Sequence, residues 1–137
     1  QVNSIADELS ELKKEFESFD NEFDRYTYLT ELSSLLPEYG NVRSDEDLFK
    51  DCQSKVWLKV RNNKGVCVIS AYSDTLIIRG ILYIFIHLLN GRNVDEVEEA
   101  KFDVLQDLGI DGIFSGNRKL GVSGLLPEII RRLKNGI

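Results

Sequence analysis

The sequence predicts an α+β fold in which a small antiparallel sheet of about three strands is flanked by N-terminal and C-terminal helices. Three observations indicate this class: a helical spacing of apolar residues near the start of the chain, a period of two in the middle, and a helical spacing again at the end. The chain has 137 residues, of which 42% are hydrophobic, and this is enough to bury one core. We therefore expect a single domain over residues 1–137.

The first part of the chain predicts two helices and a loop. A helix over about 4–19 is expected because apolar residues recur there at intervals of four and three. A second helix is expected from about Glu22 to Pro37, since the residue before a proline avoids the helical region. The residues that it would bury are Tyr26, Leu29, Leu32 and Leu36. Residues 38–50 show no period and predict a polar, acidic loop.

The middle of the chain predicts an antiparallel hairpin. Residues 55–60 alternate between polar and apolar, with Trp57 opposite the apolar face that consists of Val56, Leu58 and Val60. Residues 65–72 alternate in the same way, and Cys67 lies on their apolar face. The intervening residues 61–65 are rich in types that tolerate positive φ, which is typical of a hairpin turn.

A mostly buried helix is expected after the hairpin. Ser73 or Asp74 would cap its N-terminus, and the helix would run to about Leu89. Asn90 and Gly91 would then terminate it.

The last part of the chain predicts two more helices around a glycine-rich stretch. Asn93, followed by Glu96, resembles a capping box for a helix that ends near Leu108. Residues 109–124 contain five glycines and are expected to be the most flexible part of the chain. An amphipathic helix is expected directly after them, with Pro127 tolerated in its first turn.

Charge and hydropathy argue against two classes of partner. The formal net charge is −6, and residues 1–50 hold 13 Asp and Glu against 5 Lys and Arg. Binding to a nucleic-acid backbone requires a surface dense in positive charge, and the sequence contains only the short basic segment Arg131–Lys134. The longest apolar run, Ile81–Leu89, is too short to span a membrane and contains His87. We expect neither a nucleic-acid partner nor a membrane partner.

The chemically active residue types do not form a known catalytic or metal motif. The sequence has no P-loop, no G-x-S-x-G and no H-E-x-x-H. Cys52, Cys67 and His87 are 15 and 20 residues apart, which is unlike a four-ligand zinc site, so no metal and no cofactor are expected. Two cysteines are too few for a disulfide framework, which favours a reducing, cytoplasmic compartment. His87 is predicted to lie at the rim of an apolar helix.

The two cysteines have different surroundings. Cys67 alternates with apolar residues in a strand and is expected to be buried and inert. Cys52 is flanked by the polar residues Asp51, Gln53 and Ser54. Lys50 and Lys55 would favour its thiolate, whereas Asp51 would raise its pKa. From residue chemistry alone, Cys52 is either a reactive thiol or an incidental loop cysteine.

The residues around Cys52 resemble the signature of a known family. The segment Cys52–Leu58 is similar to the C-Q-S-x-V-W-[IL] signature of the SufE family of cysteine desulfuration proteins. Further matches lie, in order, at Arg25–Leu29, Glu31-Leu32, Leu36–Glu38, Arg43-Ser44, Ser73-Asp74, Ile78–Gly80 and Gly124-Leu125. The resemblance covers about residues 15–134.

Two positions depart from the family pattern. Asp51 stands where the family usually has a glycine before the cysteine, which bears on the turn geometry and on the ionisation of the thiol. Gly121 stands where the family tends to have an arginine, and Arg118 is the nearest residue that could replace it.

The resemblance implies a SufE/IscU-like fold and a sulfur-relay function. Cys52 would accept persulfide sulfur from a pyridoxal-phosphate-dependent, SufS-like cysteine desulfurase, stimulate that enzyme, and pass the sulfur to a downstream iron–sulfur scaffold. Such thiol exchange needs no cofactor on the acceptor. Two alternatives stay open: an iron–sulfur scaffold of the IscU type, which would need three cysteine-class ligands, and an adaptor that stimulates the desulfurase by docking alone.

The resemblance also suggests which residues would support Cys52. The expected loop-supporting residues are Arg43, Asp51, Gln53, Ser54 and Trp57, and the expected partner-binding residues are Asp74 and Arg118. Trp57 has a second interpretation as a core residue, and Asp74 as a helix cap. We further hypothesise that Cys52 turns toward an apolar pocket and that its loop swings out when the partner docks.

Overall fold

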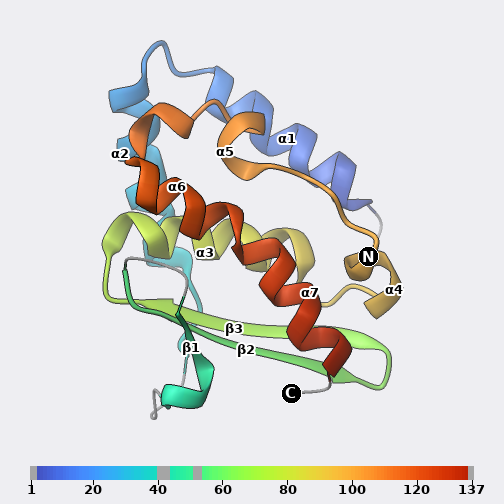
Figure 1. The fold of residues 1–137 in the computed structure, drawn as a ribbon. Coiled ribbons are helices and arrows are strands. Elements are labelled where there is room, and N and C mark those ends of the chain that lie inside the picture. Colours follow the sequence, from blue (N-terminus) through green and yellow to red (C-terminus); the bar gives the residue numbers. More distant parts are fainter. Residues whose placement is uncertain (1–2, 40–43, 51–53, 136–137) are drawn as a thin grey trace.

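The structure is a computed structural model, and it describes residues 3–39, 44–50 and 54–135. Its fold is α+β, with a three-stranded antiparallel sheet in the order β1-β2-β3 and helices gathered on one side of it (Figure 1). The elements are α1 (Ile5–Glu17), α2 (Glu22–Leu32), η1 (Ser33–Leu35), η2 (Asp45–Asp47), β1 (Leu48–Phe49), β2 (Val56–Asn63), β3 (Val66–Ser73), α3 (Leu76–Leu89), α4 (Val94–Glu98), α5 (Val104–Asp107), η3 (Asp111–Ile113), α6 (Gly116–Ser123) and α7 (Leu125–Asn135).

The core lies between the sheet and the helices that pack on it, chiefly α3 and α7. Helix α3 packs on β3 and α7 packs on β2, while α1 and α2 pack on α3 (Figure 1). The apolar faces of the two long strands supply Val56, Leu58, Val60, Cys67, Ile69 and Ala71, all at most 5% exposed. No helix among the described residues is long and apolar enough to cross a membrane.

The two N-terminal helices form as predicted, with one wrong assignment. Ser4 caps α1 through a capping box with Asp7, and Asn21 caps α2. Helix α2 ends earlier than Pro37, because the chain tightens into η1 after Leu32. Tyr26, which the spacing places in the core, is 42% exposed. Its position lies on the solvent side of a helix that buries Leu29 and Leu32.

The hairpin is confirmed, and its strands are longer than expected. β2 and β3 pair in register from Val56↔Ser73 to Asn63↔Val66, so only Lys64 and Gly65 remain for the turn. Both have positive φ, 53° and 88°, as a two-residue turn that matches the twist of the strands requires. The predicted loop 38–50 is wrong in its last part, where η2 is followed by β1.

The outer edge of β3 is covered by the segment that follows α3. The Cys67 N–H donates to Arg92 O at 2.8 Å, and the Gly91 N–H donates to Cys67 O at 2.8 Å. The Ile69 N–H donates to Asn90 Oδ1, also at 2.8 Å. This segment therefore satisfies backbone groups that an edge strand would otherwise expose.

The start of α3 differs from the prediction, and its end agrees with it. The N-cap is Thr75, and neither Ser73 nor Asp74 caps the helix, because their side chains interact with Thr75 before the helix begins. At the other end Asn90 is the C-cap, and Gly91 follows with φ 84°.

The region after α3 differs from the predicted single helix and flexible stretch. The helix expected up to Leu108 is divided into α4 and α5. No capping box forms, because the Glu96 carboxylate accepts from Arg92 at 2.9 Å and Asn93 makes no side-chain cap bond. The glycine-rich residues 109–124 form η3 and α6. The final helix α7 begins at Leu125 as expected.

Candidate functional site

The candidate site is the connection between β1 and β2, which contains Cys52. Arg43, Asp51, Cys52 and Gln53 lie outside the described residues. The two ends of the connection are described, because Phe49 pairs with Val56 across the sheet. The signature Cys52–Leu58 therefore begins in this connection and continues into β2.

The far end of this connection is fixed to the β3–α3 junction. The Ser73 hydroxyl donates to Lys55 O at 2.7 Å, and the Asp74 N–H reaches the same carbonyl at 3.4 Å. Asp74 itself is exposed and accepts from the Thr75 hydroxyl. The structure thus brings Asp74 next to the end of the cysteine-bearing segment.

Ser54 is buried at this end of the connection. It is 7% exposed, and its hydroxyl has no hydrogen-bond partner among the described residues. Leaving a buried hydroxyl without a partner costs free energy, so most such groups in folded proteins are paired.

Trp57 does not belong to the hydrophobic core, so the core interpretation is wrong. It lies on the face of β2 opposite Val56 and Leu58, where it is half-buried. Its ring centroid is 6.1 Å from that of Tyr72, its partner across the sheet. The Arg79 guanidinium lies 4.9 Å from the Tyr72 centroid. Trp57 therefore belongs to a group with Tyr72 and Arg79, and it is the second residue of β2 after the cysteine-bearing connection.

Arg118 lies on α6, and its Nε is buried without a hydrogen-bond partner in the described part of the chain. This helix ends at Gly124, where an added Cβ would lie 3.2 Å from Cζ of Phe49. The junction of α6 and α7 thus packs against the residue three positions before Cys52.

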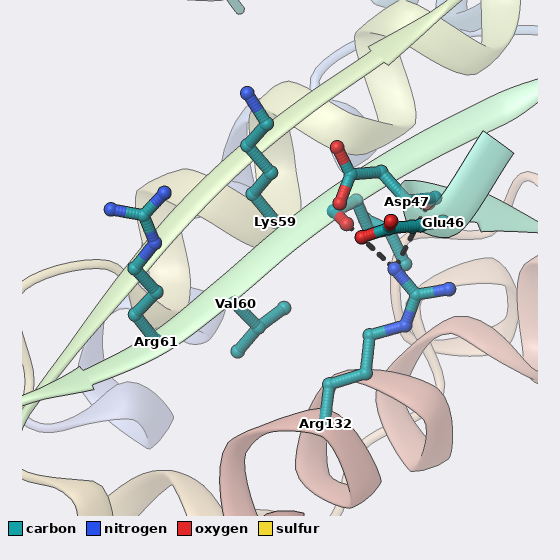
Figure 2. A pocket seen from close by; sticks show the side chains of 7 residues that line it. Glu46, Asp47, Lys59, Val60, Arg61 and Arg132 are labelled. Atoms are coloured by element: carbon teal, nitrogen blue, oxygen red, sulfur yellow. Dashed lines mark hydrogen bonds between the residues drawn. The ribbon is translucent and has the colours of Figure 1, made fainter. Parts of the chain in front are cut away.

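Arg132 is the residue at this site that the sequence reasoning missed. Its guanidinium points from α7 toward Asp47, the residue directly before β1, as Figure 2 shows. Nη1 donates to Asp47 O at 2.9 Å and to Leu58 O at 2.6 Å, and Nη2 donates to Leu48 O at 3.2 Å. Nε donates to Glu128 at 2.6 Å. Arg132 also lines a pocket of about 180 Å³ beside β2.

A sequence signal for this role exists. The charge pattern assigns Arg132 to a short basic segment, yet the residue lies on the buried stripe of α7 with Leu125, Ile129 and Leu133. An arginine on the apolar stripe of a helix is buried only where its donors find acceptors. Glu128 supplies one, and its pKa is lowered mainly by the hydrogen bond from Arg131 and further by that from Arg132, against the effect of burial.

Cys67 is a free, fully buried thiol. Burial raises its pKa to about 11, so its thiolate is scarce at neutral pH. This confirms the expected burial. A nucleophilic role for Cys67 is thus unfavourable.

The other candidate groups have structural surroundings. Within the described residues, no three His, Cys, Asp or Glu side chains are grouped to hold a metal ion. His87 is at the rim of α3, as predicted, where Nε2 lies 3.3 Å from Glu8 and the ring stacks on Tyr83.

Fold and site together define a small α+β protein that carries a cysteine between the first two strands of its sheet. A family model described as SufE, an Fe-S metabolism associated domain, matches residues 10–133. The chain belongs to the SufE family.

Two relatives agree with this assignment, and a solved structure shares the fold. An uncharacterized SufE-like protein of Rhizobium meliloti is 30% identical over 133 residues, covering 93% of this chain and 92% of the relative. One from Rhizobium etli is 27% identical, covering 92% and 89%. The solution structure of a hypothetical protein from Thermus thermophilus matches with a TM-score of 0.74 at 16% identity, over 94% of this chain and 95% of that one. This last likeness concerns the fold alone.

Proposed function

We propose that this protein is a sulfur acceptor in iron–sulfur metabolism and that Cys52 is its acceptor thiol. A cysteine desulfurase would hold sulfur as a persulfide, Cys52 would take it, and an iron–sulfur scaffold would receive it. Membership of the SufE family, with Cys52 inside the matched residues 10–133, is the observation that carries this proposal. The burial of Cys67 supports it, because the other thiol is unsuited to the task.

The proposed step is a thiol exchange. The Cys52 thiolate attacks the outer sulfur of the donor persulfide, a new S–S bond forms, and the old S–S bond breaks. The donor cysteine leaves as a thiolate, so no external oxidant or reductant is consumed. One nucleophile held in position is sufficient.

The neighbouring residues receive supporting roles in this proposal. The unpartnered Ser54 hydroxyl supplies a hydrogen-bond donor two residues from the sulfur. Asp74, exposed and adjacent to Lys55, is available to a docking partner. Gln53, Asp51 and Arg43 shape the connection, Trp57 supports it from the open face of the sheet, and Arg118 is a partner contact.

The test is single-turnover transfer from a cysteine desulfurase loaded with cysteine, followed by mass spectrometry. The wild-type protein should gain one sulfur atom on the peptide that contains Cys52. Cys52→Ser should gain none, whereas the matched control Cys67→Ser should gain sulfur at the wild-type rate, because Cys67 is buried and scarcely ionised.

Two results would contradict the proposal. Sulfur on Cys52→Ser would place the acceptor elsewhere. Full stimulation of desulfurase turnover by Cys52→Ser, with no sulfur found on the wild-type protein, would indicate an adaptor that acts by docking alone.

A further inference from the structure

We propose that Arg132 is a positioning residue for Cys52: its guanidinium holds together the two strands that flank the cysteine-bearing connection and thereby sets the reactivity of that thiol. This inference rests on the proposed function of Cys52 and adds to it a residue 80 positions away in the sequence.

The contacts place Arg132 on both sides of the connection. Leu48 O belongs to β1, before the connection, and Leu58 O belongs to β2, after it. Asp47 O, in the short helix that leads into β1, is the third backbone acceptor. One side chain therefore ties the entry and the exit of the segment to each other and both of them to α7.

β1 needs such a tie because it is short. It comprises two residues, which pair with Trp57 and Val56, and a ladder of this length is only marginally stable. Beyond Trp57, no described strand pairs with β2 on that side. At this place the Arg132 guanidinium donates to the backbone oxygen of Leu58.

The chemistry of the site requires arginine. The side chain is 8% exposed, and its charge is balanced by Glu128, whose carboxylate accepts from Nε. The planar fork directs Nη1 and Nη2 at three carbonyl groups while Nε faces the carboxylate. An ammonium group has no such fixed geometry, so lysine would keep the charge and lose part of the pattern.

The effect reaches Cys52 through a short length of chain. Phe49 precedes Cys52 by three residues, a span of at most about 10 Å when fully extended. Because Phe49 is the last residue of β1, a displacement of β1 relative to β2 shifts the point at which the cysteine-bearing connection begins. Misplacement of a reacting atom by about 1 Å can cost about a hundredfold in rate.

The experiment compares Arg132→Lys and Arg132→Gln with Arg131→Gln. Arg131 is the matched control, because it binds the same Glu128 from the next position, is 55% exposed, and touches neither strand in the described structure. Each variant would first be checked for folding by circular dichroism and thermal unfolding. The rate of Cys52 alkylation by iodoacetamide would then be measured against pH, followed by single-turnover sulfur transfer.

We expect Arg132→Lys to fold and to transfer sulfur at least about tenfold more slowly than wild type, with an altered pH profile of Cys52 alkylation. Arg131→Gln should match wild type in both measurements. A loss of stability alone, with an unchanged pH profile and unchanged transfer by the folded protein, would show a purely structural role and overturn the proposal.

Two further outcomes are covered by the design. If both Arg132 variants fail to fold, Glu128→Gln decides, because it weakens the charged acceptor that fixes Nε and so loosens the orientation of the guanidinium toward the three carbonyl groups; an unchanged alkylation profile would then overturn the proposal. If wild-type protein accepts no sulfur, the proposed function fails, and the alkylation profiles still decide whether Arg132 positions Cys52.

Discussion

Two adjacent arginines on α7 illustrate how position on a helix decides the energetic role of a residue. Arg131 and Arg132 both bind Glu128, but their side chains are 55% and 8% exposed. An exposed pair contributes little to stability, since water screens it. The buried guanidinium instead satisfies three backbone carbonyls that would otherwise lose hydrogen bonds.

Glu128 should make stability depend on pH in the acidic range. Its folded-state pKa lies below the unfolded value, chiefly because of the hydrogen bond from Arg131. Its contribution is therefore fully present above the unfolded pKa and is lost as the pH falls through the folded one. Between neutral and acidic pH, wild type should lose more unfolding free energy than Glu128→Gln. Urea denaturation at several pH values measures this, and parallel curves for the two proteins would refute it.

At the scale of elements, Gly80 lies where two helices approach each other closely. A Cβ on this residue of α3 would lie 2.2 Å from the carbonyl oxygen of Leu29 on α2. The carbonyl oxygen of Leu29 is a backbone atom and cannot change rotamer as a side chain can, so the two helices would have to separate. The glycine permits α2 to lie directly on α3.

Gly80→Ala should therefore destabilise the protein by about 1–3 kcal/mol, the usual cost of overpacking a core. Gly116→Ala is the control, because it also adds a methyl group to a helix but meets nothing within 4 Å. The control should lie within about 0.5 kcal/mol of wild type or be slightly more stable. Chemical denaturation of the three proteins gives the comparison, and equal effects of the two substitutions would contradict the packing argument.

The elements that could be predicted are those whose own residues carry the pattern. Helix α1, the hairpin β2–β3, α3 and α7 each have a long periodic apolar face. β1 could not be found, because two residues have no period and Arg132, 84 positions from Leu48, holds them in place. The helix expected over 94–108 is divided between Glu98 and Val104.

For the molecule as a whole, all layers share one core. Buried residues from α1 through α7 form a single hydrophobic cluster that includes both long strands. A core of this kind gains its stability from all elements together, so the sheet and the helices should unfold together.

We predict one cooperative unfolding transition for the chain as a single domain. Trp57, the only tryptophan, reports on the sheet by fluorescence, and circular dichroism reports on the helices. The two probes should give the same midpoint in denaturant. Separate midpoints would show that the helices and the sheet are independent units.

The site could be predicted from the sequence only in part. The signature around Cys52 identified the acceptor candidate and its immediate neighbours, because these residues are consecutive in the chain. The contact of Arg132 with Leu58 joins residues 74 positions apart, and the contact of Ser73 with Lys55 joins residues 18 positions apart. Both contacts depend on tertiary packing. No local pattern contains that information.

The cover on the outer edge of β3 has a consequence for assembly. An open strand edge invites pairing with other chains, which leads to extended sheets and aggregates. Here the Cys67 and Ile69 backbone donors are already occupied by Arg92 and Asn90. Copies of this protein should therefore not stack edge to edge through that part of β3, which helps it to remain dispersed when it is abundant.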